Sequence, residues 1–249
     1  ENYGDVTLTG TGRYAGGLVG YTEYGFLMGE NGSLLNEGRV AGFNYTGGII
    51  GYAAKYHESC VYLPSGTVNR SEVTGNQYVG GLIGAVVVGD KGVAGVKISG
   101  NYSNEAEVRG TYAVGGLFGT VQATSAEKDE GIIDFGGNMT NTGKVVMGGV
   151  SETIASSNAG GIVGYLYGRK NITITGELVN RGEIVATTRY AGATGDVVNT
   201  ATDLNAGGLF GYVLINTGEM TLDISADLIN EAPVSGQGVN EEFRNVSQR

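Results

Sequence analysis

The 249-residue sequence predicts an all-β protein, a parallel β-solenoid (β-helix) of about six to seven coils. Three observations predict this fold class. A short glycine motif recurs along the chain, and a second motif built around asparagine alternates with it. When copies of the second motif are aligned, charges of opposite sign alternate from copy to copy. Two interleaved patterns in a fixed order are typical of stacked repeats, in which each repeat packs only on its neighbours.

The first motif is a glycine box, in which a small or apolar residue is followed by Gly-Gly, two apolar residues and Gly. Clear copies begin at Ala15, Thr46, Val79, Val114, Ala159 and Ala206, and a degenerate copy covers 191–195. The chain has 47 glycines without the three-residue period of collagen, so these glycines serve turns. We expect them to mark corners of the coil, where either a positive φ or a close approach of two backbones excludes a Cβ atom.

The second motif is an asparagine box, which reads Asn, any residue, a small residue, any residue, and then Val, with Ile in one copy. Its copies begin at Asn2, Asn36, Asn69, Asn104, Asn141, Asn180 and Asn230. Residues two before, two after and four after the asparagine are mostly apolar or small, so they form the buried face of a strand with period two. An unpaired amide on that face would cost about 1–3 kcal/mol. We therefore predict a ladder, in which each amide donates to the asparagine of the next coil.

The outward positions of the asparagine box carry the charge. One column of the alignment contains Tyr3, Glu37, Arg70, Glu105, Thr142, Arg181 and Glu231, and the other contains Asp5, Arg39, Glu72, Glu107, Lys144, Glu183 and Pro233. In parallel coils about 4.8 Å apart these side chains become direct neighbours, and most neighbours have opposite charge. The alternation favours in-register stacking. With further strands between the two boxes, we expect three or four strands in each coil.

The two motifs, seen at 16–21 as Gly-Gly-Leu-Val-Gly-Tyr and elsewhere as Asn-x-Gly-x-Val, resemble the GLUG repeat family over nearly all of 1–234. Such repeats occur in large bacterial surface proteins, including adhesin-like proteins, and in non-catalytic regions of some IgA-cleaving metallopeptidases. The resemblance implies a surface-exposed scaffold without a defined activity. We divide the chain into a β-solenoid domain, 1–234, and a polar tail or cap, 235–249, and expect it to be a piece of a longer surface protein.

Composition limits the classes of partner that we expect the chain to bind. A net charge of −10 argues against nucleic acid, whose binders need clustered Lys and Arg. No apolar stretch approaches the roughly 18 residues that a membrane helix needs, so we do not expect a membrane-embedded protein. The single cysteine, Cys60, excludes an internal disulfide framework. We expect a cell-surface or secreted protein without a cofactor, whose partners are other domains of a longer parent chain, neighbouring subunits, or host glycans or proteins.

Short motifs do not predict an enzyme. His57-Glu58 lacks the second histidine of a zinc-protease helix, because position 61 is Val and the chain has no other histidine. With Cys60, His57 supports only a weak intermolecular metal site. Ser125 and Lys128 match the Ser-x-x-Lys of acyl-enzyme hydrolases, whose companion motifs are absent.

Carboxylates provide two further candidates. Glu72 and Glu107 are neighbours in one column, flanked by Arg39 and Lys144, so a salt-bridged surface is favoured over an active site. A second acidic group contains Asp129, Glu130 and Asp134, and it lacks the Asp-rich repeat of calcium-binding β-rolls. We expect no catalytic residue and no metal site.

Tyrosines give the strongest signal of an interaction surface. One set precedes glycine boxes, and a second set follows them as Tyr21, Tyr52, Tyr165 and Tyr212. Recurrence in the repeats favours stacking between coils, and an exposed row that binds glycans or a protein is the other interpretation. The candidate ligand contacts are Tyr14, Tyr45, Tyr78, Tyr112 and Tyr190. We therefore predict a non-enzymatic structural or adhesive module, a stalk or interaction scaffold, with a glycan-binding or polysaccharide-active β-helix as the alternative.

Overall fold

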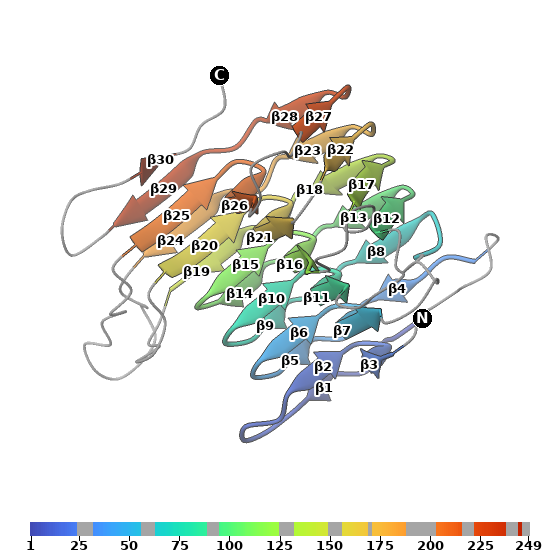
Figure 1. Ribbon diagram of the computed structural model, residues 1–249. Helices are drawn as coiled ribbons and strands as arrows, with labels where there is room; N and C mark the ends of the chain where they lie inside the picture. The colour runs from blue at the N-terminus through green and yellow to red at the C-terminus, as the bar shows by residue number, and fades with distance from the viewer. Residues whose placement is uncertain are drawn as a thin grey trace.

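The computed structural model confirms an all-β parallel solenoid (Figure 1). It describes residues 1–23, 32–55, 63–88, 95–124, 132–148, 156–168, 171–187, 203–215, 222–237 and 244–245. Within these residues it contains strands β1 to β30 and no helix, so none of them forms a helix that could cross a membrane. The candidates His57, Cys60, Ser125, Lys128, Asp129, Glu130 and Tyr190, the degenerate glycine box and most of the tail lie outside the described residues.

Strands of successive coils pair in five parallel sheets, which we number I to V in the order in which the chain enters them. Sheet I ends on the asparagines and contains β4 (Leu35–Asn36), β8 (Thr67–Asn69), β13 (Tyr102–Asn104), β18 (Met139–Asn141), β23 (Leu178–Asn180) and β28 (Leu228–Asn230). Sheet II begins on the valine column and contains β1 (Val6–Thr7), β5 (Val40–Ala41), β9 (Val73–Thr74), β14 (Val108–Gly110), β19 (Val145–Met147), β24 (Ile184–Thr187) and β29 (Val234–Gln237).

Sheets III and IV lie before and after the glycine box. Sheet III contains β2 (Tyr14–Gly16), β6 (Tyr45–Gly47), β10 (Tyr78–Gly80), β15 (Ala113–Gly115), β20 (Ser156–Gly160), β25 (Asp203–Gly207) and β30 (Arg244–Asn245). Sheet IV contains β3 (Val19–Thr22), β7 (Ile50–Lys55), β11 (Ile83–Val88), β16 (Phe118–Ala123), β21 (Val163–Gly168) and β26 (Phe210–Ile215). Sheet V closes the coil with β12 (Gly95–Ser99), β17 (Ile132–Gly136), β22 (Ile172–Ile174) and β27 (Leu222–Ile224).

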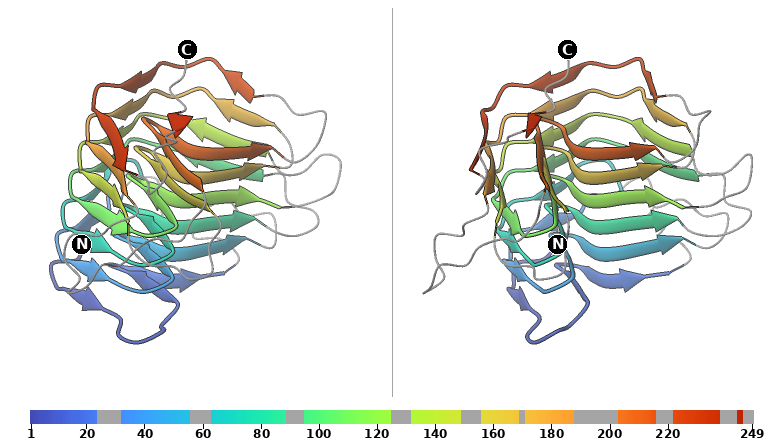
Figure 2. Two further views of the ribbon diagram at one scale, coloured as in Figure 1. Left: turned by 90° about the vertical axis from the view of Figure 1, so that its left-hand side faces the viewer. Right: turned by 60° about the vertical axis from the view of Figure 1, so that its left-hand side comes forward.

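The complete coils have five strands, so the predicted three or four strands per coil were too few. The chain bends at both motifs, and each bend divides a run that the sequence pattern presents as one strand. The asparagine box ends a strand of sheet I and begins one of sheet II, and the glycine box separates sheet III from sheet IV. The coils stack in sequence order, as the two side views show (Figure 2).

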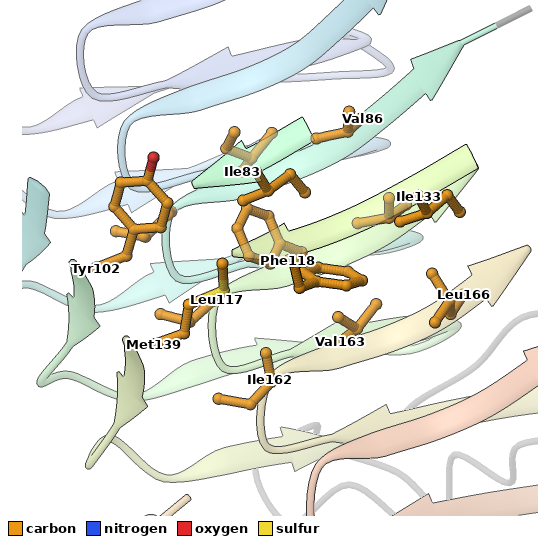
Figure 3. Packing of buried hydrophobic residues seen from close by; sticks show 14 of the residues in the cluster. Ile83, Val86, Tyr102, Leu117, Phe118, Ile133, Met139, Ile162, Val163 and Leu166 are labelled. Carbon is orange, nitrogen blue, oxygen red and sulfur yellow. The ribbon is translucent and has the colours of Figure 1, made fainter. Parts of the chain in front are cut away.

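The buried apolar residues form two separate clusters. The larger cluster fills the space among sheets I, IV and V, and Figure 3 shows Phe118 and Met139 within it. Phe135 is another of its largest side chains. The smaller cluster lies between sheets II and III and consists of alanines and β-branched residues such as Val73 and Val108, with Met147. β-Branched side chains suit such fully buried parallel strands. The coil therefore encloses two apolar compartments instead of one.

Candidate functional site

The recurring asparagines form one hydrogen-bonded ladder through the described coils. Each Nδ2 donates to the Oδ1 of the next asparagine, at 2.7 Å from Asn36 to Asn69, 2.7 Å from Asn69 to Asn104 and 2.8 Å from Asn104 to Asn141. The second hydrogen of Nδ2 goes to the backbone carbonyl two residues ahead, which for Asn104 is that of Ala106 at 2.8 Å. The ladder runs from Asn2 to Asn230, and its five inner members are fully buried. Each inner amide is thus satisfied without water.

The glycine box packs directly against this ladder. A Cβ atom on Gly81 would lie 2.1 Å from the carbonyl oxygen of Gly116 and 2.5 Å from Cγ of Asn104. The second glycine of each other box meets a ladder asparagine in the same way. Among the described residues, the glycines with positive φ are Gly10, Gly66, Gly100 and Gly137, all outside the boxes. Close approach, and not backbone conformation, therefore requires glycine in the boxes.

This contact explains the division of the core. The asparagine corner, between sheets I and II, touches the glycine corner, between sheets III and IV. The two corners meet between the larger and the smaller apolar cluster. Ladder and glycines together form a thin polar partition through the middle of each coil.

The charged columns form ion pairs between coils. Arg70 lies between Glu37 of the preceding coil, at 3.3 Å, and Glu105 of the following coil, at 3.1 Å. Lys144 pairs with Glu183 at 2.8 Å, and Arg181 pairs with Glu231 at 2.7 Å. These side chains are between 39% and 54% exposed, so solvent weakens each ion pair. The columns therefore contribute only weakly to the alignment of successive coils.

The two carboxylates of the candidate pair are each bound by a cation. Glu72 accepts from Arg39 at 3.4 Å and from the hydroxyl of Thr74 at 2.8 Å. Glu107, directly before β14, pairs with Arg109 of that strand, a partner outside the two aligned columns. The arrangement favours a structural role for both carboxylates.

Asp134 is the described member of the second acidic group. It lies on sheet V in register between Lys97 and Thr173, and it is half-buried. Within the described part of the chain, no three His, Cys, Asp or Glu side chains come close enough to hold a metal ion.

The tyrosines line the outward side of sheets III and IV. On sheet III the aligned column contains Tyr14, Tyr45, Tyr78, Ala113, Asn158 and Asn205, and Arg244 of β30 continues it. On sheet IV the aligned column contains Tyr21, Tyr52, Ala85, Thr120, Tyr165 and Tyr212. Tyr112 is not in the sheet III column, because one extra residue separates it from its glycine box and Ala113 pairs with Tyr78 instead. We call the twelve residues from Tyr14 to Asn205 and from Tyr21 to Tyr212, together with Tyr112, the tyrosine row.

Rings of the two columns contact one another across the glycine box. Tyr45 stacks on Tyr78, with ring centroids 5.0 Å apart and planes 3° apart, and it meets Tyr52 edge-on at 4.8 Å. The ring centroids of Tyr14 and Tyr21 are 4.9 Å apart. Because outward side chains of two sheets converge in this way, the outer surface turns inward at the glycine corner. The stacking interpretation of the tyrosines therefore describes their packing, and the tyrosine side chains of the row remain partly exposed.

Tyr78 and Tyr165, two tyrosines of the row, have raised pKa values. Burial, followed by the neighbouring Tyr112 and Tyr45, raises the pKa of Tyr78 above its usual range. Burial, followed by Tyr112 and Tyr212, raises the pKa of Tyr165 to about 12. The ring of Tyr112 also meets that of Tyr78 edge-on, with ring centroids 5.0 Å apart.

The polar residues of the row were not among the predicted site residues. Asn158 is buried, and its Oδ1 accepts from Nδ2 of Asn205 at 2.9 Å, whereas its own Nδ2 has no hydrogen-bond partner among the described residues. Thr120 donates to the backbone carbonyl of Tyr165 at 2.9 Å. The signal was present in the sequence, because Asn158 and Asn205 occupy the position two before the Gly-Gly of their boxes, where Tyr14, Tyr45 and Tyr78 stand.

Comparisons with protein-family models, curated proteins and solved structures found no match. The resemblance to the GLUG repeat family therefore rests on the two sequence motifs. Conclusions about function rest on the geometry of the coils and of the tyrosine row.

Proposed function

We propose that the chain is a non-enzymatic structural or adhesive module of a bacterial cell-surface or extracellular protein, which acts as a stalk or interaction scaffold. The observation that carries this proposal is that the recurring polar side chains bind the next coil. The asparagines bind one another, and the charged columns pair along the axis. With seven strands in sheets II and III, the stack spans roughly 30 Å at about 4.8 Å per strand.

Two further features support the proposal. The carboxylates that could act as acid and base, Glu72 and Glu107, are held by arginines. Solenoids of this kind present long continuous side surfaces, which suit spacing and binding more than enclosure of a substrate. The motif resemblance supports the bacterial surface location.

Two measurements test the proposal. Intact cells of the source organism are treated with protease, and an antibody against the chain follows its loss. Loss before lysis is expected, whereas complete protection until lysis would refute a surface or secreted location.

Purified protein is also incubated with soluble polysaccharides, and new reducing ends are measured. No release is expected. Release that disappears in Glu72→Gln or Glu107→Gln, with Asp5→Asn as the matched control on the same column, would refute the non-enzymatic role.

A further inference from the structure

The tyrosine row, which ends one strand before Arg244, contains no charged residue. Its thirteen positions contain tyrosine, alanine, asparagine and threonine, although the chain has 15 basic and 25 acidic residues. The outward columns beside the asparagine ladder are by contrast largely Glu, Arg and Lys. Arg13, next to Tyr14, is the charged side chain that acts on Tyr45 of the row. A row whose own positions are uncharged in such an acidic chain favours a neutral ligand over an ionic one.

The row also has the shape of an extended site. It contains about one rung per coil, with stacked ring centroids separated by 5.0 Å between Tyr45 and Tyr78 and by 5.7 Å between Tyr165 and Tyr212. Ring faces bind apolar surface, and phenol hydroxyls at their edges donate and accept hydrogen bonds. Tyr21 and Tyr212, near opposite ends of the row, are 42% and 37% exposed. A ligand that offers both an apolar face and hydroxyl groups at every step matches this repetition.

An unsatisfied amide lies within the same row. Asn158 is only 1% exposed, and its Nδ2 has no hydrogen-bond partner within the described part of the chain. A buried donor without a partner costs about 1–3 kcal/mol, and such groups in a folded protein call for an explanation. Asn158 lies on β20 in register with Ala113, and its backbone N–H donates to the carbonyl of Tyr112, so the amide belongs to the sheet III column of the row.

We propose that the tyrosine row binds an extended, uncharged polysaccharide that lies along the solenoid axis with roughly one sugar unit per coil. A pyranose ring has an apolar face of C–H groups for the tyrosine rings and equatorial hydroxyls for their phenols. The step between rungs is similar to the length that one sugar unit adds to an extended polysaccharide. A proline-rich peptide also binds aromatic surfaces, but its repeat of three residues at about 3.1 Å each does not match one rung per coil. The proposal deepens the proposed function as an interaction module and rests on it.

The binding test uses the full chain and a panel of soluble glucan, mannan, xylan and galactan, with polygalacturonate as the charged comparison and a proline-rich peptide as the competing ligand class. Affinity gel electrophoresis and calorimetry measure binding at low and high salt. We expect at least one neutral polysaccharide to bind with an affinity that salt leaves unchanged, because no ionic contact contributes. Polygalacturonate and the peptide are not expected to bind.

Variants then locate the site. Tyr52→Ala is expected to weaken binding about tenfold, since one stacking face is lost, and Tyr52→Phe is expected to keep most of the affinity. Tyr3→Ala is the matched control, because Tyr3 is 64% exposed and bonds to Glu1 outside the row. Circular dichroism verifies the fold. If Tyr52→Ala unfolds the chain, Tyr21→Ala and Tyr212→Ala replace it, because these rings are already exposed.

Three outcomes would overturn the proposal: no neutral polysaccharide of the panel binds, polygalacturonate or the peptide binds better, or binding survives in the folded row variants. Each of these leaves the proposed scaffold function standing if the chain is removed from intact cells by protease. Protection of the chain until lysis would instead refute the scaffold function, whatever the binding result.

Discussion

Replacement of Asn104 by alanine tests whether the ladder holds the coils together. Asn104 donates to Oδ1 of Asn141 and to the carbonyl of Ala106, both at 2.8 Å, and it accepts from Asn69 at 2.7 Å. At about 0.5–1.5 kcal/mol for each lost hydrogen bond, these three contribute about 1.5–4.5 kcal/mol, and the space left against Gly81 adds a cavity term. We expect the free energy of unfolding to fall by about 3–5 kcal/mol, a large part of the usual 5–15 kcal/mol.

The matched control is Asn2→Ala, at the first and partly exposed rung. Asn2 donates to Asn36 at 2.7 Å and to the carbonyl of Gly4 at 2.9 Å, and water replaces these bonds more readily there, so we expect a loss of about 1 kcal/mol. Urea unfolding followed by circular dichroism and tyrosine fluorescence gives both values, and coincidence of the two signals verifies a two-state transition. Equal losses in the two variants would refute the idea that the buried ladder is a main source of stability.

Three further predictions concern the glycine box, the charged columns and the tyrosines. Gly81→Ala is expected to lower the free energy of unfolding by about 2 kcal/mol or more through overpacking. The control is Gly4→Ala, whose Cβ would meet nothing within 4 Å and which should leave urea unfolding nearly unchanged. Equal effects of the two variants would contradict the role of close approach. Arg70→Glu places an acidic side chain between Glu37 and Glu105, so the urea midpoint of unfolding is expected to fall more at low salt than at high salt. A loss that does not depend on salt would count against the ion pairs. The pKa of Tyr165 is raised to about 12 in the folded chain and is about 10 in the unfolded chain, so the free energy of unfolding should be unaffected below pH 10 and should fall as the pH rises to 12. Phenolate absorbance, measured together with circular dichroism, checks this. Ordinary titration of every tyrosine in the folded chain would contradict it.

The fold was predictable because a parallel stack places equivalent residues side by side. The alternation of Glu37, Arg70 and Glu105 has a physical meaning only if residues more than thirty positions apart are neighbours, and the structure pairs them. The buried face of the asparagine box follows from period two, and Val73 and Val108 of that face are fully buried. The period-two pattern within each strand and the charge alternation between coils therefore predict the same fold.

The cross-section of the coil was not predictable in the same way. Contact between Gly81 and Asn104 joins different motifs across the interior, and no periodicity in the sequence records which corner faces which. The two-compartment core depends on that contact, and the count of five strands per coil depends on the bends at the two motifs. The place of Tyr112 was missed for a simpler reason, since a single extra residue before its glycine box shifts the side chain out of the column.

The strand register does not depend on the number of residues in a coil. Ladder partners are 33 residues apart between Asn36 and Asn69 and 50 apart between Asn180 and Asn230, yet their hydrogen bonds measure 2.7 and 2.8 Å. Added residues enter between strands, as between Thr187 of β24 and Asp203 of β25, and each doubling of such a segment costs only about 0.6 kcal/mol in closure entropy. A lineage that carries this repeat is thus free to lengthen one coil and acquire new sequence there, while the rungs above and below keep their partners.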